Sequence, residues 1–568
     1  MQKLELTWIG KDKSEGKEME VEPRILLHKN EKSYGDKNTQ NLLIHGDNLL
    51  ALKSLEEKFS GRIKCIYIDP PFNTGARINA DGEEVGYYDG LEHSIWLEMM
   101  KVRLEVLKKL LSEDGAIIVH LDDRECAYCK VLLDEIFGRG NYINTITMTT
   151  NDPSGFKATG NKIFSTSNFL LVYGKNKSKT EIKKIYISKK YDKAYSKVFT
   201  NMNGSFKEWK WSNIKDIVCS ENGFSSSKEA IKKVGSKVVD YWIEKYALEN
   251  SEFVFRTAAI GGGAKIKRYK TIELSKKNRE EIFVHENEDV ENFYILNGEQ
   301  ILFYKDRFEL IDGKMMPAQA ITDVWTDISW TGIAKEGGVV FKNSKKPEAL
   351  IKRILDIFTN EGDYVLDSFL GSGTTAAVAH KMGRKWIGIE FGEHCYTHCK
   401  PRLEKVIDGS DKSGISKSIN WQGGGGFKFY ELAPSLLKKD KYDNWIIDQD
   451  NYNIDMLAAA MAKLNGYFYK PDKDVFWKQG KSTESSYIFT TTQYITAQYL
   501  ESLANELEFN ERLLVCCSAF DSGLNNSYDN ITIKKIPQSV LSRCEFGISD
   551  YNMNIINDEK VAVDEDEI

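Results

Sequence analysis

Two stretches of this chain alternate short apolar runs with helical patterns, and this alternation restricts the fold more than any other feature. In the first stretch, strand-like runs occupy residues 42–45, 63–68 and 116–119, and helical patterns occupy 48–59 and 94–111. In the second stretch, helical patterns at 349–358 and 374–382 alternate with strand-like runs at 364–367 and 385–390. Strands alternating with helices form a parallel sheet whose functional sites lie at the carboxyl ends of the strands. The sequence therefore predicts an α/β fold.

A basic segment separates the two stretches. Residues 178–280 contain 23 Lys and Arg against 12 Asp and Glu, a net charge of +11; because the whole 568-residue chain carries −6, the remainder carries −17. A localised basic segment in an acidic chain is typical of a face that binds a polyanion, although a solvated lysine-rich surface has the same composition. We expect the segment either to interrupt one sheet domain or to separate two.

Composition places the chain among globular proteins, with 41% hydrophobic and 29% charged residues. No window approaches the roughly 18–20 apolar residues of a membrane span. The first residues lack the apolar core of a secretory signal. Nine cysteines in 568 residues is sparse, which favours a reduced, cytoplasmic protein with free thiols.

Glycine punctuation and charge divide the chain into expected parts. The tetraglycine at 423–426 indicates a boundary. The expected parts are an N-terminal segment (1–40), the first half of the sheet domain (41–177), a basic insert (178–325), the second half of the sheet domain (326–408) and a C-terminal domain (409–568).

A glycine-rich turn joins a predicted strand to a predicted helix at Asp367-Ser-Phe-Leu-Gly-Ser-Gly-Thr-Thr-Ala376. Gly371 and Gly373 permit a tight turn and a close approach of the backbone to a ligand, and Gly-x-Gly-x-x-Ala fits the dinucleotide-binding fingerprint. Glu390 ends the next strand, where an acidic side chain holds ribose hydroxyls. The motif predicts an adenosine-containing cofactor. Alone, it is also compatible with a nicotinamide-dependent oxidoreductase or an ordinary strand-to-helix turn.

The second motif, Asp69-Pro-Pro-Phe72, follows the strand-like run 63–68. Its two prolines fix the backbone and hold a carboxylate, a carbonyl and an aromatic ring in a stiff arrangement. Such an arrangement suits the modification of a planar exocyclic amine. The Asp69 carboxylate and the Pro70 carbonyl can accept its two N–H bonds and aim its lone pair, while Phe72 offers a stacking face. We therefore expect Asp69, Pro70, Pro71 and Phe72 to be the catalytic residues, the alternative being a merely structural Asp at a proline turn.

These motifs resemble the amino-group DNA methyltransferases of the β arrangement, most closely the modification (Mod) subunits of type III restriction–modification systems. Asp69-Pro-Pro-Phe-Asn-Thr-Gly75 resembles their catalytic motif and Asp367-Ser-Phe-Leu-Gly-Ser-Gly-Thr374 their cofactor loop, with Phe341 and Lys346-Pro347 before that loop. The order, catalytic motif, insert and then cofactor loop, favours DNA over protein or RNA. The resemblance implies a Rossmann-like methyltransferase domain with permuted motif order, an inserted α+β target-recognition domain and a C-terminal α/β domain.

Two positions depart from the pattern of this family. Ser368 stands where many relatives have proline, which changes the stiffness of the loop, and Phe72 stands where many have tyrosine, which keeps the stacking face. The His-Glu pair that some relatives carry before the Leu-Val-Tyr strand is missing around residues 164–169, which affects the expected local loop geometry but not the expected reaction.

The resemblance also implies the cofactor, S-adenosylmethionine, and its contacts. Asp367 and Asp69 would hold the methionine ammonium, Glu390 the ribose, and Asp47 the adenine edge. The expected cofactor-binding residues are Asp47, Asp69, Lys346, Asp367, Phe369, Gly371, Ser372, Gly373, Thr374, Thr375 and Glu390.

The insert is the expected reader of DNA sequence. Cations and aromatics alternate in Trp209-Lys210-Trp211 and again in Lys265-Ile-Lys267-Arg268-Tyr-Lys270. We expect the lysines to contact phosphates and Arg268 to contact a base. For both tryptophans, core packing is the competing interpretation.

The leading prediction is a site-specific methyltransferase acting on the N6 amine of an adenine flipped out of duplex DNA. Methylation of cytosine N4 and a non-catalytic recognition subunit that guides a nuclease stay open as alternatives. Expected partners are double-stranded DNA, a second copy of the chain and a helicase-nuclease restriction subunit. No metal site is predicted, because His394-Cys-Tyr-Thr-His-Cys399 and Cys126-x-x-Cys129 lack a second ligand cluster.

Overall fold

The computed structural model describes a large part of the chain and divides it into two compact units. The described residues are 6–8, 11, 24, 26–74, 76–78, 87–89, 92–150, 163–285, 293–311, 313–341, 344–433, 437–439, 445–447, 457–459, 461–462, 465–472, 474–483, 485–536 and 555–557. One unit comprises Met1–Lys183 with Asp323–Ile568, and the other is the insert Lys184–Thr322.

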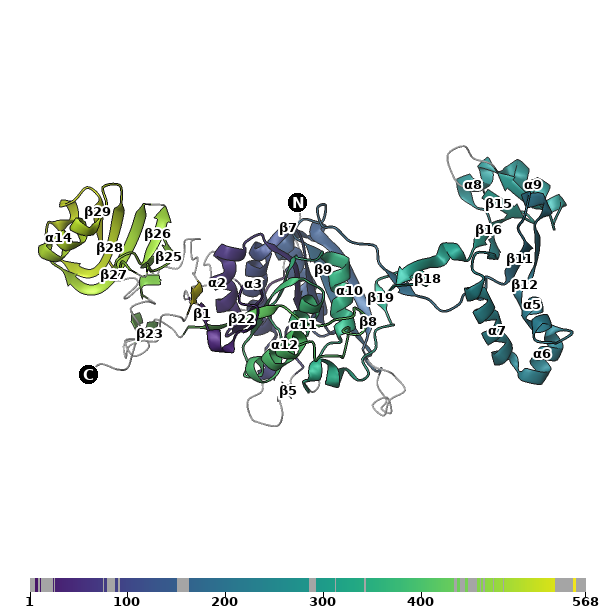
Figure 1. Cartoon of the computed structure of the whole chain (residues 1–568), viewed down its shortest axis with the longest axis horizontal. Helices are drawn as coiled ribbons and strands as arrows, with labels where there is room; N and C mark the ends of the chain where they lie inside the picture. The colour runs from purple at the N-terminus through teal and green to yellow at the C-terminus, as the bar shows by residue number, and fades with distance from the viewer. Residues whose placement is uncertain are drawn as a thin grey trace. The chain divides into compact units, whose positions relative to one another are not determined.

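A single mixed sheet forms the centre of the first unit (Figure 1). In spatial order it contains β19 (Val324–Trp325), β8 (Tyr142–Thr149), β9 (Ser167–Gly174), β7 (Leu111–Leu121), β4 (Ile63–Ile68), β20 (Tyr364–Asp367), β21 (Lys385–Glu390), β3 (Leu42–His45), β22 (Gly426–Leu432), β1 (Leu26–His28) and β30 (Ile555–Asn557), and β2 (Tyr34–Gly35) pairs with β22. From β7 through β22, neighbouring strands run parallel.

The two alternating stretches of the sequence therefore build one domain. β4, from the first stretch, pairs with β7 on one side and with β20, from the second stretch, on the other. Both strands are almost entirely apolar and buried, as expected of parallel strands covered on two faces. The insert interrupts the sheet domain and does not separate two.

Six α-helices cover this sheet within the described residues. They are α2 (Asn48–Phe59), α3 (His93–Leu110), α4 (Cys126–Leu133), α10 (Glu348–Phe358), α11 (Thr374–Lys381) and α12 (Lys400–Ile407). Four of them, α2, α3, α10 and α11, lie close to where the sequence predicts them. The range of α2 is the predicted one, whereas β7 is longer than the predicted run 116–119. Asp47 caps α2 by accepting hydrogen bonds from the N–H groups of Leu49 and Leu50.

The insert contains a six-stranded antiparallel sheet, a three-stranded antiparallel sheet and five helices within its described residues. The larger sheet is β12 (Lys210–Asn213), β11 (Lys197–Asn201), β13 (Val254–Ala258), β16 (Glu299–Phe303), β15 (Phe293–Leu296) and β14 (Ile282–His285), and the smaller is β10 (Tyr186–Ser188), β18 (Lys314–Ala320) and β17 (Phe308–Ile311). The helices are α5 (Ile214–Glu221), α6 (Ser227–Val234), α7 (Ser236–Glu249), α8 (Gly262–Lys267) and α9 (Tyr269–Lys277).

The two sheet-domain residues that flank the insert are hydrogen-bonded within the sheet domain. The Lys183 N–H donates to the Ile357 carbonyl at 3.0 Å, and the Asp323 carbonyl accepts from the Thr147 N–H at 2.8 Å. Because β19 already belongs to the main sheet, the compact insert is slightly shorter than the expected range 178–325.

The boundary expected at residue 409 is wrong, because the chain after α12 returns to the main sheet. β22 runs parallel to β3, with Phe429 opposite Leu43, and buries Phe427 and Phe429. A second core begins further on, around β25 (Phe468–Tyr469), β26 (Gly480–Thr483), β27 (Ser486–Ile495), β28 (Arg512–Phe520), β29 (Ile531–Lys535) and α14 (Ala497–Glu506). Two small hairpins pair β5 (Ala76–Ile78) with β6 (Tyr87–Asp89) and β23 (Leu437–Lys439) with β24 (Trp445–Ile447).

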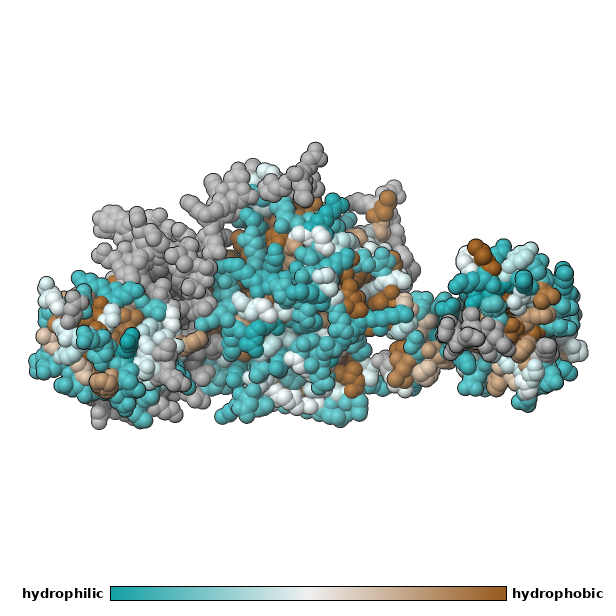
Figure 2. All heavy atoms as spheres, turned by 90° about the horizontal axis from the view of Figure 1, so that it is seen from above, coloured by the Kyte–Doolittle hydropathy of each residue, from teal (hydrophilic) through white to brown (hydrophobic). Residues whose placement is uncertain are grey.

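The described surface in Figure 2 is mainly hydrophilic, with apolar side chains in small groups. Within the described residues, no helix has both the length and the apolar character that crossing a membrane requires. The cysteines that the structure describes are free thiols, most of them buried.

Candidate active site

Two carboxylates lie at the carboxyl ends of neighbouring parallel strands. Asp367 is the last residue of β20, and Asp69 directly follows β4, its partner in the sheet. The two side chains are close enough for the charge of Asp69 to raise the pKa of Asp367. Strand pairing thus brings together residues almost 300 positions apart in sequence, at the edge of the sheet where the fold predicts a site.

Asp367 is a buried carboxyl with an unusual protonation equilibrium. Burial, with smaller contributions from Asp69 and Glu390, raises its pKa to about 7. Two hydrogen bonds oppose this rise: the Thr375 hydroxyl donates to Oδ2 at 2.6 Å and the Phe369 N–H donates to Oδ1 at 2.9 Å. A cation bound beside Asp367 would favour its charged form.

The glycine turn between β20 and α11 has the backbone conformation that only glycine adopts readily. Gly371 and Gly373 have φ of 56° and 79°. A Cβ on Gly373 would lie 3.3 Å from the Cα of Cys399, whereas a Cβ on Gly371 would meet nothing closer than the Phe369 carbonyl at 4.0 Å. Gly373 therefore serves close packing, and Gly371 leaves open space in front of the turn.

Glu390 at the end of β21 holds this turn in place. Its Oε2 accepts a 2.6 Å hydrogen bond from the Gly371 N–H, and its Oε1 accepts one from the Gly392 N–H at 3.0 Å. His394 Nε2 lies 2.9 Å from Oε1. Glu390 thus orders the loop through its own hydrogen bonds. Its contact with a ribose stays a prediction.

Two hydrogen bonds with buried side chains hold the Asp-Pro-Pro-Phe segment and the residue after it. The indole N–H of the fully buried Trp96 donates to the Pro71 carbonyl at 2.8 Å. Asn73, with a positive φ of 60°, donates to the buried Glu125 at 2.8 Å. Both contacts stiffen the segment, as its two prolines predict.

Lys346 contributes a positive charge beside the catalytic motif. Its ammonium forms an ion pair with Asp69 Oδ2 and lies 5.2 Å from the centroid of the Phe72 ring. The sequence places Lys346 before the glycine turn, and the structure brings its ammonium to the carboxylate of Asp69.

His120 on β7 lies beside the Asp-Pro-Pro-Phe segment among polar groups that no sequence motif identifies. The ring is fully buried, 5.7 Å from Phe72 between centroids, and contacts Tyr67 Oη at 2.8 Å and Asn168 Nδ2 at 3.0 Å. Burial, and then the charge of Lys346, holds the pKa of His120 well below its usual value, so the ring is neutral. Polar residues on the adjacent strands β4, β7 and β9 were the signal that could have identified this group.

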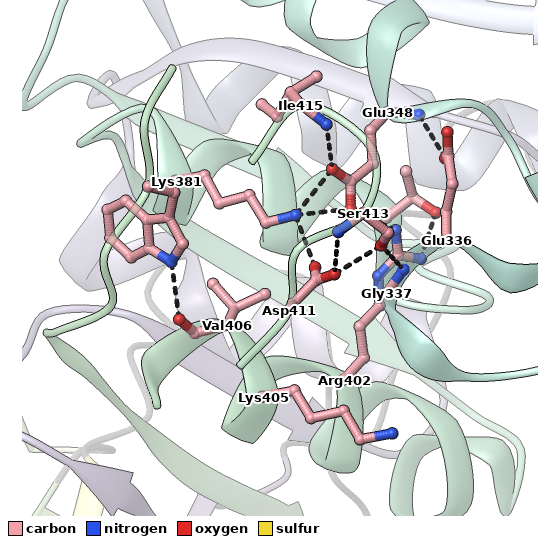
Figure 3. A network of polar contacts seen from close by, with 12 residues as sticks. Glu336, Gly337, Glu348, Lys381, Arg402, Lys405, Val406, Asp411, Ser413 and Ile415 are labelled. Carbon is pink, nitrogen blue, oxygen red and sulfur yellow. Dashed lines mark hydrogen bonds and ion pairs between the residues drawn. The ribbon is translucent and has the colours of Figure 1, made fainter. Parts of the chain in front are cut away.

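A buried charged network is hydrogen-bonded to the glycine turn, and Figure 3 shows its ion pairs among Glu348, Lys381 and Asp411. Arg402 on α12 donates to the Thr374 hydroxyl at 2.7 Å, to the Ser372 carbonyl at 3.3 Å and to Glu348 at 2.8 Å. Lys381 donates to Glu348 at 2.8 Å and to Asp411 at 2.6 Å. The side chains of Arg402, Lys381 and Glu348 are fully buried.

Several side chains that we expect to contact the cofactor already bond to other residues of the protein. Ser372, Thr374 and Thr375 are nearly buried and bond to Arg402, to each other or to Asp367. Asp47, besides capping α2, lies 3.4 Å from the guanidinium of Arg103. Their cofactor roles stay predictions.

In the insert, the structure separates the expected DNA-binding residues into two groups. Trp209 and Trp211 pack against Phe199, Tyr294 and Phe255 in the core of the larger sheet, which favours the packing interpretation. Arg268 stacks on Phe293, with its guanidinium carbon 4.0 Å from the ring centroid. The side chains that remain exposed are Lys210, Lys265, Lys267 and Lys270.

The described residues contain no group of three or more His, Cys, Asp or Glu side chains placed to hold a metal ion. In the segment 394–399, the His394 ring faces Glu390 and the His398 ring contacts the Val340 carbonyl at 3.1 Å.

Several known proteins are similar in sequence to this chain. The chain is 39% identical over 424 residues to the probable type III restriction-modification enzyme HindVI Mod subunit of Haemophilus influenzae; the match covers 70% of this chain and 54% of that protein, so the chain spans about half the length of this relative. Type II methyltransferase M.EcaI of Enterobacter cloacae is 26% identical, covering 74% of this chain and 80% of that one. The EcoP15I Mod subunit of Escherichia coli is 24% identical, covering 77% and 72%.

Among solved structures, the M1.HpyAVI–SAM complex matches 64% of this chain and 98% of its own at 15% identity, with a TM-score of 0.30 that is too low to support an argument. The family model for DNA methylases, in contrast, matches residues 63–400, which is more than half of the chain and contains both motifs. The chain belongs to the DNA methylase family.

Proposed function

We propose that this protein transfers a methyl group from S-adenosylmethionine to the N6 amine of an adenine flipped out of duplex DNA. We propose further that it acts in the cytoplasm as the modification subunit of a type III restriction–modification system. One observation carries the proposal: Asp69 of the Asp-Pro-Pro-Phe motif and Asp367 of the glycine loop meet at the ends of adjacent strands.

The residues present fit S-adenosylmethionine. Two neighbouring carboxylates, Asp69 and Asp367, suit an ammonium group, and the raised pKa of Asp367 indicates a buried acid that a cation would stabilise. The open space at Gly371 leaves room for a ligand against the loop. When bound, S-adenosylmethionine supplies an electrophilic methyl group on a positively charged sulfur.

The catalytic segment positions the amine. The Asp69 carboxylate and the Pro70 carbonyl accept its two N–H bonds, and Phe72 stacks on the base. The amine gains positive charge as it reacts, so the Asp69 carboxylate stabilises the transition state more than the ground state. The neutral His120, whose ring centroid lies 5.7 Å from that of Phe72, adds no positive charge, and the stiff Pro70-Pro71 turn keeps the acceptors aligned.

The base must leave the duplex to reach this segment, which costs a few kcal/mol. Stacking on Phe72 and phosphate contacts from the exposed lysines of the insert offset this cost. By similarity to the Mod subunits, we propose a second copy of the chain and a helicase-nuclease subunit as its partners.

The test is methyl transfer from labelled S-adenosylmethionine to DNA, followed by digestion to nucleosides. N6-methyladenine is the expected product, and N4-methylcytosine would overturn the choice of base. A protein that binds both S-adenosylmethionine and DNA but transfers no methyl would instead be a recognition subunit.

A further inference from the structure

A polar cavity inside the insert lies outside the surfaces that the sequence singles out. It has a volume of about 470 Å³ and is bordered by β10, β13, β17, β18 and the loop after β10. This volume lies within the roughly 300–1,000 Å³ of pockets that hold ligands. The aromatic rings of Tyr195 and Tyr304, 4.7 Å apart between centroids, form part of its wall.

Positive charge predominates around this cavity. Five cationic side chains border it, against three carboxylates; the cations are Lys184, Lys189, Lys190, Arg256 and Arg307. The carboxylates are Asp192, Asp306 and Glu309. Asp192 accepts a hydrogen bond from the Ala194 N–H at 3.0 Å. The Lys184, Lys189 and Lys190 side chains are exposed, so the cavity is open to a charged ligand.

Among these cations, Arg256 has a buried donor atom that no acceptor in the described residues satisfies. Its guanidinium carbon lies 5.3 Å from the centroid of the Tyr195 ring. Its Nε is buried and, within the described part of the chain, has no hydrogen-bond partner, and no carboxylate there forms an ion pair with the guanidinium. Arg307, in contrast, donates from Nε to Tyr195 Oη at 3.0 Å. A buried donor without an acceptor is costly unless a ligand supplies one.

We propose that this cavity binds a phosphate group of the DNA backbone, with Arg256 as its principal ligand and Lys184, Lys189 and Lys190 around it. A guanidinium presents a planar set of donors that matches phosphate oxygens, and the ring of Tyr195 holds its plane. The site deepens the proposed function, on which it rests: it gives the insert a phosphate contact that positions the duplex without reading its sequence.

The experiment compares the full-length protein with Arg256→Gln and Lys189→Gln for binding to a fluorescent duplex over a range of salt concentrations. Lys193→Gln is the matched control, because Lys193 is an exposed cation of the same segment that pairs with Asp240 at 2.8 Å and does not border the cavity. Removal of one phosphate contact should make the slope of log K against log salt shallower by about 0.9.

We expect Arg256→Gln and Lys189→Gln to show this shallower slope for target and non-target duplexes alike, and Lys193→Gln to match the wild type. Lys189 is exposed, so its variant remains informative if Arg256→Gln does not fold. Unchanged slopes in both variants, or an equal change in Lys193→Gln, would overturn the proposal.

Titration with inorganic phosphate separates two sources of the ligand. If Arg256→Gln abolishes binding of inorganic phosphate but leaves the DNA slope unchanged, the cavity serves a free phosphate and the DNA assignment is wrong. A wild-type protein without methyl transfer would refute the proposed function and leave the salt slopes as a separate test of the cavity.

Discussion

Arg402 donates a 2.7 Å hydrogen bond to the hydroxyl of Thr374, the first residue of the helix that follows the cofactor loop. The same guanidinium binds Glu348 at the start of α10, two residues after Lys346, which pairs with Asp69. Buried ion pairs contribute little net stability, because desolvation offsets their attraction. Their effect here is geometric, because the Arg402 side chain links the glycine loop to α10, the helix that begins two residues after the partner of Asp69.

Replacing Arg402 by Lys should therefore weaken S-adenosylmethionine binding by about tenfold, roughly the 1.4 kcal/mol expected when one charged hydrogen bond to the loop is removed. DNA affinity should stay unchanged. Calorimetric titration of both ligands measures these effects.

Lys381→Met is the control, because Lys381 is as buried as Arg402 and also pairs with Glu348. Its other partner is Asp411. Both variants should melt at lower temperature, but only Arg402→Lys should bind the cofactor weakly. Equal reductions of cofactor affinity would make Arg402 a general stabiliser of the fold.

Cofactor affinity should depend on pH through Asp367, whose pKa is raised to about 7. The carboxyl is mostly protonated below that value and attracts an ammonium only when ionised. Affinity for S-adenosylmethionine should thus rise about tenfold between about pH 6 and pH 8. Near pH 7, where about half of the carboxyls are protonated, binding should release about half a proton per cofactor, which calorimetry in buffers of different ionisation enthalpy detects.

The free energy of unfolding should depend on pH in the opposite direction to the cofactor affinity. A carboxyl whose pKa is higher in the folded than in the unfolded chain stabilises the fold below its unfolded pKa and loses this contribution as pH rises through about 7. Asp367→Asn should flatten both pH profiles. A wild-type affinity profile that is flat over this range would refute the assignment of Asp367 to the ammonium.

Asp69→Asn should lower the rate of methyl transfer by about 100- to 1,000-fold, the scale of losing one preorganised group that stabilises transition-state charge. DNA affinity should stay close to wild type, since the side chain is about four-fifths buried beside Lys346. Single-turnover transfer with pre-bound DNA measures the rate. Undiminished turnover would mean that another carboxylate carries the reaction.

Gly371→Ala should mainly weaken cofactor binding, whereas Gly373→Ala should mainly lower thermal stability. Both residues have positive φ, so each alanine costs about 1 kcal/mol of backbone strain. At 373 the added Cβ also meets Cys399, which should lower the melting temperature further, whereas at 371 it enters the open space and should weaken cofactor binding. Thermal melts and cofactor titrations of both variants separate the two effects.

The elements of the sheet domain were predictable because their signals are local. The apolar runs of β4 and β20 and the helical pattern of α2 lie where the structure has them. The pairing of β4 with β20 depends on contacts between distant segments, and only the family resemblance indicated it.

Other features left no local signal. Arg402 lies 28 residues beyond Thr374, and no spacing rule connects a helical arginine to a distant loop. Trp209 and Trp211 alternate with Lys210 in a way that equally suits a DNA face and a strand with one packed side, and only burial decides between them. The return of β22 to the sheet escaped prediction because the tetraglycine before it indicates a boundary.

The insert leaves the sheet domain at Lys183 and returns at Asp323, and both points are anchored by backbone hydrogen bonds to that domain. No described strand of residues 184–322 belongs to the main sheet, so β4, β20 and the carboxylates at their ends lie outside the insert. Under the proposed function, replacement of the insert would therefore change the DNA sequence that is recognised and leave the reacting residues in place.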